Sequence, residues 1–468
     1  MKSFDSVSLK LWIEQNDLTG ARIQKIQQPT RRDLIFLIRK NGETKKLYIN
    51  INPQYYHICF MSKENEKKRH IEIPFKPPMF CMLLRKYLEN AVISKINQPQ
   101  YERIIEFYIE TYNDLSEKIY LCLAVELMGK HSNIILYNYD TNIILGCAHN
   151  VGSEKSRERE LAGTLPYIYP PNPPKQWYVS KDTFANDKSS DVNSIIDSYF
   201  AQVICEDKLY NLREKYKQIV SKKLKKEKAS YSKMQYKLEK EYDCDKYRLW
   251  GDLIMANLYN RKDYSSFVKV YDYENEKEIK IELDNTKTLK DNANIFYKLY
   301  AKGKNTVNKL TELTNTAKIE IDYLEQVLYF LDLASNIDEI KMIASEMEQE
   351  KATKDNKKSF EPEEFELDGG RVWVGKNNRQ NDYIVSKLSK DEDYWFHTKD
   401  CPGSHVLLRS DNPPDSLVLK CAKLAKEYSK ASESSKVSVI YTKRKYLKKP
   451  PKANLGYVIY KNEREILV

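Results

Sequence analysis

Two long segments of this 468-residue chain can form extended helices that need each other as partners. Residues 211–240 are rich in lysine and contain neither glycine nor proline, so nothing in them breaks a helix. Residues 310–331 carry apolar or small side chains in alternating steps of four and three, which is the spacing of a coiled-coil seam. The seam consists of Leu310, Thr314, Ala317, Ile321, Leu324, Leu328 and Leu331. With a short β-like insert at 265–283, the segments predict an antiparallel coiled-coil hairpin.

The segment before the hairpin mixes strand and helix patterns. Strand-like stretches come in pairs that are separated by turn residues, such as Asn41 and Gly42. A helix is expected after Pro78, with Met79, Met82, Leu83 and Lys86 at helical spacing. The expected strands are 34–39, 46–52, 119–125 and 133–139, and the expected helix is 78–88. A proline-rich segment at 166–174 ends this α+β domain.

The segment after the hairpin begins with a charged linker at 348–364 and contains a dense polar run. Residues 376–381 form that run, which we interpret as a loop, and an aromatic and histidine cluster follows at 394–397. The expected strands are 371–374, 383–388, 394–397 and 405–408, and an amphipathic helix is expected at 417–428. The chain is therefore α+β and multidomain, because one core stops growing near ~250–300 residues. We expect domains at 1–175, 176–355 and 356–468.

Charge and cysteine usage limit the class of protein. The formal net charge of +11 favours a polyanionic partner such as nucleic acid. The eight cysteines include no CxxC pair and no tight cluster with histidine, which argues against a zinc site and a disulfide scaffold. No signal-like segment opens the sequence, and no apolar run approaches the ~20 residues of a membrane span. We expect a cytoplasmic protein with no metal and no membrane contact.

The sequence offers no convincing catalytic site. It has no GxSxG, HExxH or Walker loop, so hydrolysis of an ester, a peptide or a nucleotide is not indicated. His131 lies beside Ser132 and His405 beside Ser404, but adjacent side chains of a strand point to opposite faces. We interpret these residues as RNA contacts or turn formers. The chain is expected to be a binding protein with no cofactor and no enzymatic activity.

Three stretches have the composition of nucleic-acid surfaces, and each also has a purely structural explanation. The lysines around 222–228 can contact phosphates or simply form a solvated helix face. Amides and guanidinium groups in the polar run can bond RNA, while Trp395 and Phe396 can stack bases or lie in the core. The basic tail around 441–452, which contains two tyrosines, can bind nucleic acid or protect a sheet edge.

Several long strings resemble the NFACT family. They are 4–5 and 22–36 near the N-terminus, 77–84 (PPMFCMLL), 126–136 (ELMGKHSNIIL), 247–258, 292–305 and 374–409. The strings occur in the expected order and cover most of the chain. The resemblance implies an NFACT-N domain, a coiled-coil middle region and a C-terminal NFACT-R RNA-binding domain. The family's helix-hairpin-helix module is apparently absent, because 175–193 is only a short polar stretch.

The resemblance also implies a function in ribosome quality control. Such a factor binds a stalled large ribosomal subunit that carries peptidyl-tRNA and recruits tRNA, in bacteria alanyl-tRNA. The ribosome then adds a C-terminal alanine tail without mRNA. The implied tRNA-binding residues are Asp5, Glu102, Arg103, Glu126, Met128, Lys130, His131 and Asn133. The candidate contacts to ribosomal RNA are Lys222, Lys223, Lys225, Lys226, Lys376, Asn378, Arg379, Lys399, His405 and Arg409.

One pair departs from the family pattern, and two other functions stay open. The family has an Asp-Arg pair where this chain has Glu102 and Arg103, so the acid is one methylene longer. Relatives have been called fibronectin-binding, which suggests a surface adhesin, although no signal peptide is recognised here. The NFACT-N fold also resembles that of formamidopyrimidine-type DNA glycosylases, but these use an N-terminal proline amine and this chain has Lys2 there.

Overall fold

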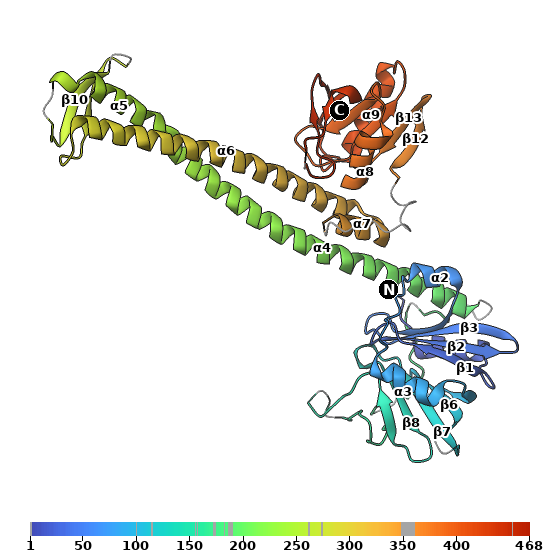
Figure 1. Cartoon of the computed structure of the whole chain (residues 1–468). Helices are drawn as coiled ribbons and strands as arrows, with labels where there is room; N and C mark the ends of the chain where they lie inside the picture. Colours follow the sequence, from blue (N-terminus) through green and yellow to red (C-terminus); the bar gives the residue numbers. More distant parts are fainter. Residues whose placement is uncertain are drawn as a thin grey trace. The chain divides into compact units, whose positions relative to one another are not determined.

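The computed structural model describes residues 2–99, 101–113, 116–154, 156, 158–171, 175–181, 183–185, 191–260, 263–272, 275–347, 361–451 and 453–468. The chain forms two compact units, residues 1–209 and 210–468, and the long helix α4 (Val192–Glu241) spans the boundary between them. Together they contain the mixed helices and sheets of the predicted α+β class (Figure 1). The domain boundaries at 175 and 355 remain predictions.

The first unit is built on a nine-stranded antiparallel sheet with the order β4-β3-β2-β1-β5-β6-β7-β8-β9. The strands are β1 (Arg22–Gln27), β2 (Asp33–Lys40), β3 (Glu43–Asn50), β4 (His57–Met61), β5 (Val92–Asn97), β6 (Ile104–Tyr112), β7 (Lys118–Glu126), β8 (Asn133–Asn138) and β9 (Ile144–Cys147). The helices are α1 (Ser6–Gln15), α2 (Lys63–Lys68) and α3 (Met79–Leu88), with a short 3-10 turn η1 (Gly129–His131).

Both predicted strand pairs are present. Strands β2 and β3 form a hairpin whose two turn residues, Asn41 and Gly42, have φ angles of 51° and 84°. Two left-handed residues in succession match the twist of the flanking strands, which explains the Asn-Gly sequence. Strands β7 and β8 pair around the turn that holds η1.

Helix α3 is present where it was expected, and of the residues cited for its spacing Leu83 packs against the core. The fully buried side chains of the helix are Cys81, Leu84 and Leu88. Met79 is 89% exposed and Met82 is 52% exposed. Helical spacing was therefore a correct indication of the helix, whereas Met79 and Met82 at that spacing do not belong to the face that packs on the core.

The first turns of α4 belong to the core of the first unit. Val192, Ile196 and Phe200 are buried in the same apolar cluster as the sheet. An ion pair fixes this packing, since Arg69 donates from Nη1 to Asp197 Oδ1 at 2.6 Å with both side chains almost fully buried. Among the described residues between 175 and 191 none is helical, so these residues show no helix-hairpin-helix motif.

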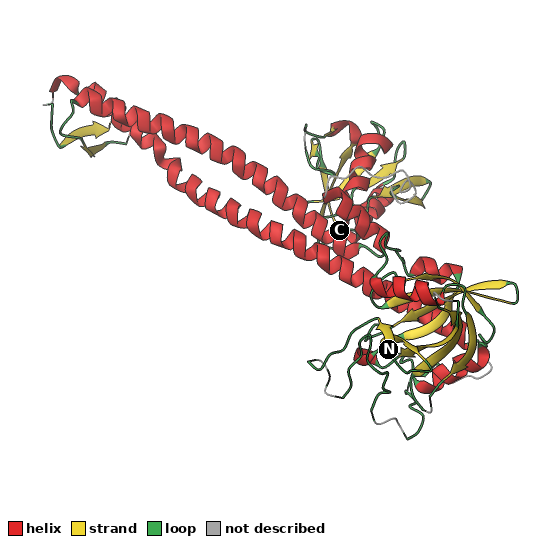
Figure 2. Ribbon diagram, turned by 60° about the horizontal axis from the view of Figure 1, so that its bottom comes forward, coloured by secondary structure: helices red, strands yellow, loops and turns green. Residues whose placement is uncertain are grey.

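The second unit begins with a helical hairpin. After α4 the chain continues through η2 (Tyr242–Cys244), α5 (Asp245–Ala256), η3 (Leu258–Asn260), β10 (Phe267–Asp272), β11 (Lys277–Glu282), α6 (Leu289–Leu333) and α7 (Ile337–Met347). Helix α6 returns alongside α4, and β10 and β11 lie at the turn (Figures 1 and 2). Arg213 donates to the carbonyl of Ala334 at 2.6 Å, which ties α4 to the end of α6.

The predicted coiled-coil seam is the buried face of α6. Leu310, Ile321 and Leu324 are buried, as are the other seam members except Leu328, which is half-buried. At the far end of the hairpin Gly303 approaches Cys244 so closely that an added Cβ would lie 2.6 Å from the cysteine Cβ. The antiparallel hairpin with a β insert is therefore confirmed.

The C-terminal part of the second unit contains a six-stranded sheet with the order β12-β13-β15-β14-β16-β19. Its strands are β12 (Glu363–Leu367), β13 (Gly370–Val374), β14 (Tyr394–Thr398), β15 (Val406–Arg409), β16 (Ser438–Lys443) and β19 (Arg464–Leu467). Helix α9 (Asp415–Glu427) packs on one face. Helix α8 (Asn378–Tyr383), the π-helical turn η5 (Ile384–Leu388) and the small hairpin of β17 (Leu447–Lys448) and β18 (Ile459–Tyr460) belong to the other face.

Two sequence-based expectations for this domain are wrong. The polar run at 376–381 is not a loop, because the Asn377 side chain accepts from the Gln380 backbone N–H and caps α8. The segment 383–388 is helical rather than a strand. The other expected strands and the helix at 417–428 are present, with ends shifted by a few residues. Most of the expected linker at 348–364 lies outside the described residues, and its end begins β12.

Candidate nucleic-acid interfaces

In the first unit, Arg103 is held between two tyrosines just before β6. Its Nη1 donates to the Tyr56 hydroxyl at 2.8 Å, and its guanidinium carbon lies 5.6 Å from the centre of the Tyr56 ring and 5.0 Å from that of Tyr178. Cation–π attraction and the hydrogen bond restrict the orientation of the guanidinium. Within the described part of the chain no carboxylate forms an ion pair with it, so its positive charge stays available.

The neighbouring acid, Glu102, is partly buried. Burial raises the pKa of its carboxyl above the ordinary value, and the nearby Arg103 guanidinium opposes that shift. The Glu102 backbone N–H donates to the Pro99 carbonyl at 3.1 Å. Glu102 and Arg103 are adjacent in the sequence, and their side chains form no ion pair with each other.

The turn η1 lies against the same tyrosine. Gly129 has φ 66° and its Cβ position would be 3.8 Å from the Tyr56 ring, so a larger residue would be strained there and close to the ring. The next two residues, Lys130 and His131, are exposed, and Met128 is half-buried. We call the set Tyr56, Arg103, Lys130, His131 and Tyr178 the Arg103 surface.

Two other residues expected to bind tRNA are buried and have structural roles. The Asp5 carboxylate caps α1 by accepting from the Ser8 backbone N–H at 2.8 Å, and it also accepts from Ser180 N–H at 2.8 Å. The Asn133 side chain donates to the His149 carbonyl at 2.8 Å and accepts from its N–H at 3.0 Å. Both side chains are at most 2% exposed, so neither offers a free group to RNA.

Glu126 is likewise buried, with no exposed surface. Its carboxylate is bound on both oxygens by the Arg159 guanidinium, and it accepts from the Tyr167 hydroxyl at 3.0 Å. The low-dielectric surroundings and the attraction of Glu126 raise the pKa of Tyr167. This group holds the loop at 158–168 to the sheet rather than facing a ligand.

The four candidate lysines of α4 differ in whether they are paired with the other helix of the hairpin. Lys222, Lys225 and Lys226 are exposed, and none of them forms an ion pair with a described residue. Lys223 instead donates to Glu320 of α6 at 2.6 Å. Three of the four predicted contacts thus remain available to phosphates, and the fourth serves the hairpin.

Four polar residues of the C-terminal domain already have partners. Asn378 is 2% exposed and donates to Glu346 at 2.9 Å. Burial raises the pKa of Glu346. The remaining pairs, all within 2.9 Å, are Lys376 with Glu363, Lys399 with Glu465 and Arg409 with Asp393, and Arg379 is half-buried. Because Asn378 is buried, it cannot contact RNA as we expected from the sequence.

The histidine expected to bind RNA, His405, is 3% exposed and lies in an aromatic cluster. Its ring meets the rings of Trp395 and His397 edge-on, at centre distances of 5.1 Å and 5.3 Å. Burial lowers the pKa of His397 to about 4 and that of His405 well below the ordinary value, so both imidazoles are neutral at pH 7. Trp395 and Phe396 are buried, which agrees with the core role that was one of the two roles considered for them.

Sequence reasoning missed Tyr56 and Tyr178, the two rings beside Arg103. They lie far from it along the chain, and tyrosine is abundant in this sequence, with 35 residues. Only the folding of β4 and of the segment after 175 against β6 brings them together. Among the described residues no cluster of histidine, cysteine, aspartate and glutamate could hold a metal ion. None of the described helices is long and apolar enough to cross a membrane.

Comparison with known proteins gives a consistent assignment. The family model described as NFACT N-terminal and middle domains matches residues 12–184 and 174–364, and that of the NFACT protein RNA binding domain matches 362–462. The Rqc2 homolog RqcH of Bacillus subtilis is 29% identical, over 96% of this chain and 95% of the relative. The homologue from Streptococcus suis is 28% identical, over 97% and 95%.

A solved structure is similar to part of this chain. It is titled as the C-terminal part of the fibronectin/fibrinogen-binding protein from Streptococcus suis, with 29% identity and a TM-score of 0.44. The match covers 56% of this chain and 94% of that one. Since the TM-score is below 0.5, the assignment rests on the family models. The alignment with the Bacillus subtilis relative runs over 547 positions, so that relative contains segments with no counterpart here.

Proposed function

Because the chain belongs to the NFACT family, we propose that it acts in ribosome quality control as an RNA-binding factor and not as an enzyme. It binds a large ribosomal subunit that carries peptidyl-tRNA and recruits tRNA, in our proposal alanyl-tRNA. The peptidyl-transferase centre of the ribosome then adds alanine to the nascent chain. The observation that carries this proposal is the Arg103 surface.

The geometry of Arg103 suits the positioning of a tRNA. Its guanidinium has five N–H donors and uses one of them on Tyr56. The rings of Tyr56 and Tyr178 fix the plane of the group, so little side-chain entropy is lost when it meets a phosphate or a base edge. Lys130 and His131 extend the same surface. Such a site needs charge and orientation but no nucleophile or general base.

The helical hairpin makes the second unit long. Helix α6 has 45 residues, which at ~1.5 Å per residue is about 67 Å. The exposed lysines of α4 lie on the hairpin, where they can meet phosphates of ribosomal RNA. A binding factor that has to contact separated features of the ribosome requires such an extended element.

The first test removes the Arg103 guanidinium. We expect Arg103→Ala to lower tRNA affinity by about ten- to a hundredfold, since a charged contact contributes roughly 1.5–3 kcal/mol. Large-subunit association should persist. The measurement is sequencing and quantification of the RNA that co-purifies with the tagged chain, together with subunit co-sedimentation.

Matched variants make that test specific. Arg39→Ala, which removes an exposed arginine of β2, should leave tRNA recovery unchanged. Glu102→Asp restores the acid of the family pattern and should also be tolerated. If tRNA is recovered with Arg103→Ala at the wild-type level, the assignment of this surface is wrong.

The second test concerns the lysines of α4. We expect replacing Lys222, Lys225 and Lys226 by Gln to reduce the slope of log affinity for the large subunit against log salt, by about one unit for each phosphate that the protein no longer neutralises. Lys223→Gln should change the slope less, because its charge is already paired with Glu320. A slope unchanged in the triple variant would show that these lysines form only a solvated helix face.

A further inference from the structure

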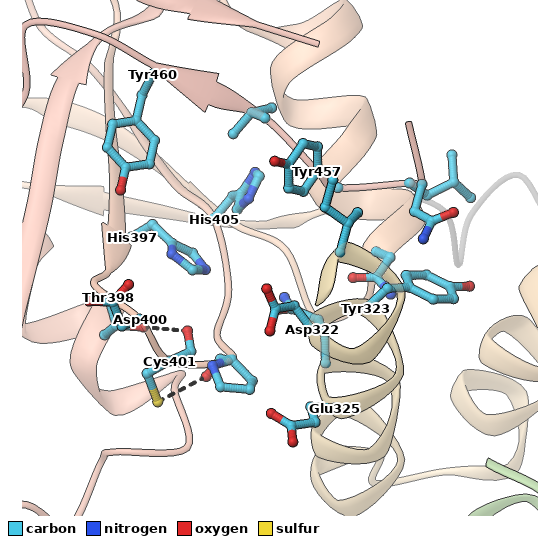
Figure 3. A pocket seen from close by; sticks show the side chains of 18 of the residues that line it. Asp322, Tyr323, Glu325, His397, Thr398, Asp400, Cys401, His405, Tyr457 and Tyr460 are labelled. Atoms are coloured by element: carbon cyan, nitrogen blue, oxygen red, sulfur yellow. Dashed lines mark hydrogen bonds between the residues drawn. The ribbon is translucent and has the colours of Figure 1, made fainter. Parts of the chain in front are cut away.

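The second unit contains a cavity of about 520 Å³ beside the C-terminal sheet. It lies on the face opposite α9, where Trp395 and His397 of β14 and the adjacent His405 form one wall. Helix α6 contributes Asp322 and Glu325 to the opposite side. Figure 3 shows His397 on the side of the cavity across from Asp322, and His405 beside Tyr457.

Two polar groups in the wall of this cavity have no partner. Trp395 is 1% exposed and His405 is 3% exposed, yet the indole Nε1 and the His405 Nδ1 are hydrogen-bonded to nothing in the described part of the chain. An indole N–H can only donate, so it requires an acceptor. Buried donors are nearly always satisfied in folded proteins, so an unsatisfied donor on a residue that lines a cavity points to a ligand that brings the acceptor.

The wall itself is aromatic and uncharged. The rings of Trp395 and His397 are stacked at 5.7 Å with an interplanar angle of 6°, and Tyr460 lies 5.9 Å from the indole. His397 and His405 are neutral because burial lowers the pKa of each. A planar heterocycle fits such a wall better than an aliphatic or a phosphate group does.

The opposite side of the cavity selects against anions. Asp322 and Glu325 of α6 line it together with Asp400, and burial together with these neighbours raises the pKa of Asp322. Glu325 is paired with Lys228 of α4 at 2.5 Å, so Asp322 is the α6 carboxylate left to repel a phosphate or to accept a hydrogen bond from an amino group. The exposed Lys318, one helical turn before Asp322, can meet a phosphate at the rim.

From these observations we propose that the cavity takes one unpaired nucleobase of an RNA strand. The base offers a ring nitrogen or carbonyl oxygen to the Trp395 N–H and an amino group to the Asp322 carboxylate of α6. A cationic side chain would satisfy the carboxylates but would leave the indole donor without an acceptor. This inference rests on the proposed RNA-binding function and names the group that the C-terminal domain binds.

The experiment measures binding of RNA hexamers to the full chain by fluorescence anisotropy. Homopolymers of A, C, G and U are compared with an abasic hexamer of the same backbone. We expect Trp395→Phe, which keeps an aromatic ring but removes the donor, to weaken the A, C and G hexamers about five- to tenfold. The abasic hexamer should bind both proteins equally.

A matched control and a second variant keep the test decisive. Trp373→Phe changes a buried tryptophan of the same sheet that does not line the cavity, and it should change no affinity. Uracil has no amino group, so the wild-type chain should prefer the A, C and G hexamers to U. Asp322→Asn, at an exposed residue of α6, should remove that preference even if Trp395→Phe fails to fold.

Several outcomes would overturn the proposal. These are equal binding of the base-containing hexamers by wild type and both variants, an equal loss of affinity for the abasic hexamer in the Trp395→Phe chain, or displacement of RNA by an arginine peptide. A chain that binds the large subunit but no hexamer would overturn this inference alone. A chain that binds neither would overturn the proposed function as well.

Discussion

The Arg103 surface and the cavity beside Trp395 use similar residue types in opposite ways. At Arg103 a permanent charge is held at the surface by the rings of Tyr56 and Tyr178. On the Trp395 side of the cavity both histidines are neutral and the indole donor is buried, and the carboxylates lie on the opposite side. The first site can bind through phosphates and charge, whereas the second can recognise only a group that fits and offers hydrogen bonds.

The difference shows that burial, rather than residue type, decides which polar residues are available to RNA. Glu126 and Asn133 come from the same characteristic string as Lys130, and Asp5 comes from another, yet all three acids and amides hold the fold together. In the C-terminal domain the same is true of Asn378, which bonds Glu346. A ligand-binding residue must keep a hydrogen-bonding group that the fold itself does not use.

The largest expected effect concerns the core role of the tryptophan. We expect Trp395→Ala to lower the free energy of unfolding by about 3–5 kcal/mol, because the ring is almost fully buried. The measurement is urea denaturation, with unfolding monitored by amide hydrogen exchange in β14 and β15. Phe75→Ala, at a side chain that is 99% exposed, should have no such effect. A Trp395→Ala chain of wild-type stability that no longer binds RNA would show that the ring is only a stacking platform.

A middle-sized effect separates the two sites by pH. The unfolded His397 has an ordinary pKa of 6.5 and the folded one about 4. Below pH 6.5 the unfolded chain therefore takes up a proton that the folded domain does not, and stability is lost as the pH falls. From pH 7 to pH 5 this amounts to about 2 kcal/mol for His397.

His405 acts in the same direction, so the decrease in stability of the wild type should exceed that of a His397→Gln chain. The measurement is the urea concentration at the unfolding midpoint, obtained from amide exchange in β14 at a series of pH values. The Arg103 surface belongs to the first unit, so tRNA binding there should not follow the loss of stability of the C-terminal domain. A pH-independent midpoint would contradict the neutral state of the half-buried His397 and the buried His405.

The smallest expected effect tests how Arg103 is oriented. Tyr56→Phe removes the hydroxyl that accepts from Arg103 Nη1 at 2.8 Å but keeps the ring under the guanidinium. We expect tRNA affinity to fall about fivefold, since one such hydrogen bond contributes roughly 1 kcal/mol. Tyr112→Phe, at an exposed tyrosine of β6, is the control. A decrease as large as that of Arg103→Ala would mean that Tyr56 itself binds the RNA.

The regular elements could largely be predicted, and the failures have a common cause. The Asn41-Gly42 turn and the seam on α6 follow from local backbone preference and from periodicity. Helix α3 was found, but its face was found only in part, because the spacing included Met79 and Met82, which are exposed. The run at 376–381 contains loop-forming amides, yet the Asn377 cap and the packing of Ile384 make the segment helical.

The sequence by itself determined the family, the α+β class and the antiparallel hairpin, because long specific strings and heptad spacing need no contacts between distant residues. Only the tertiary structure decided which polar side chains are free. Glu126 forms an ion pair with Arg159, and Lys223 forms one with Glu320. Arg103 instead packs against two tyrosine rings, and the indole N–H of Trp395 has no hydrogen-bond partner among the residues that the structure describes. These outcomes depend on residues that are distant in the chain and on the loss of water around them, and neither is encoded in local composition.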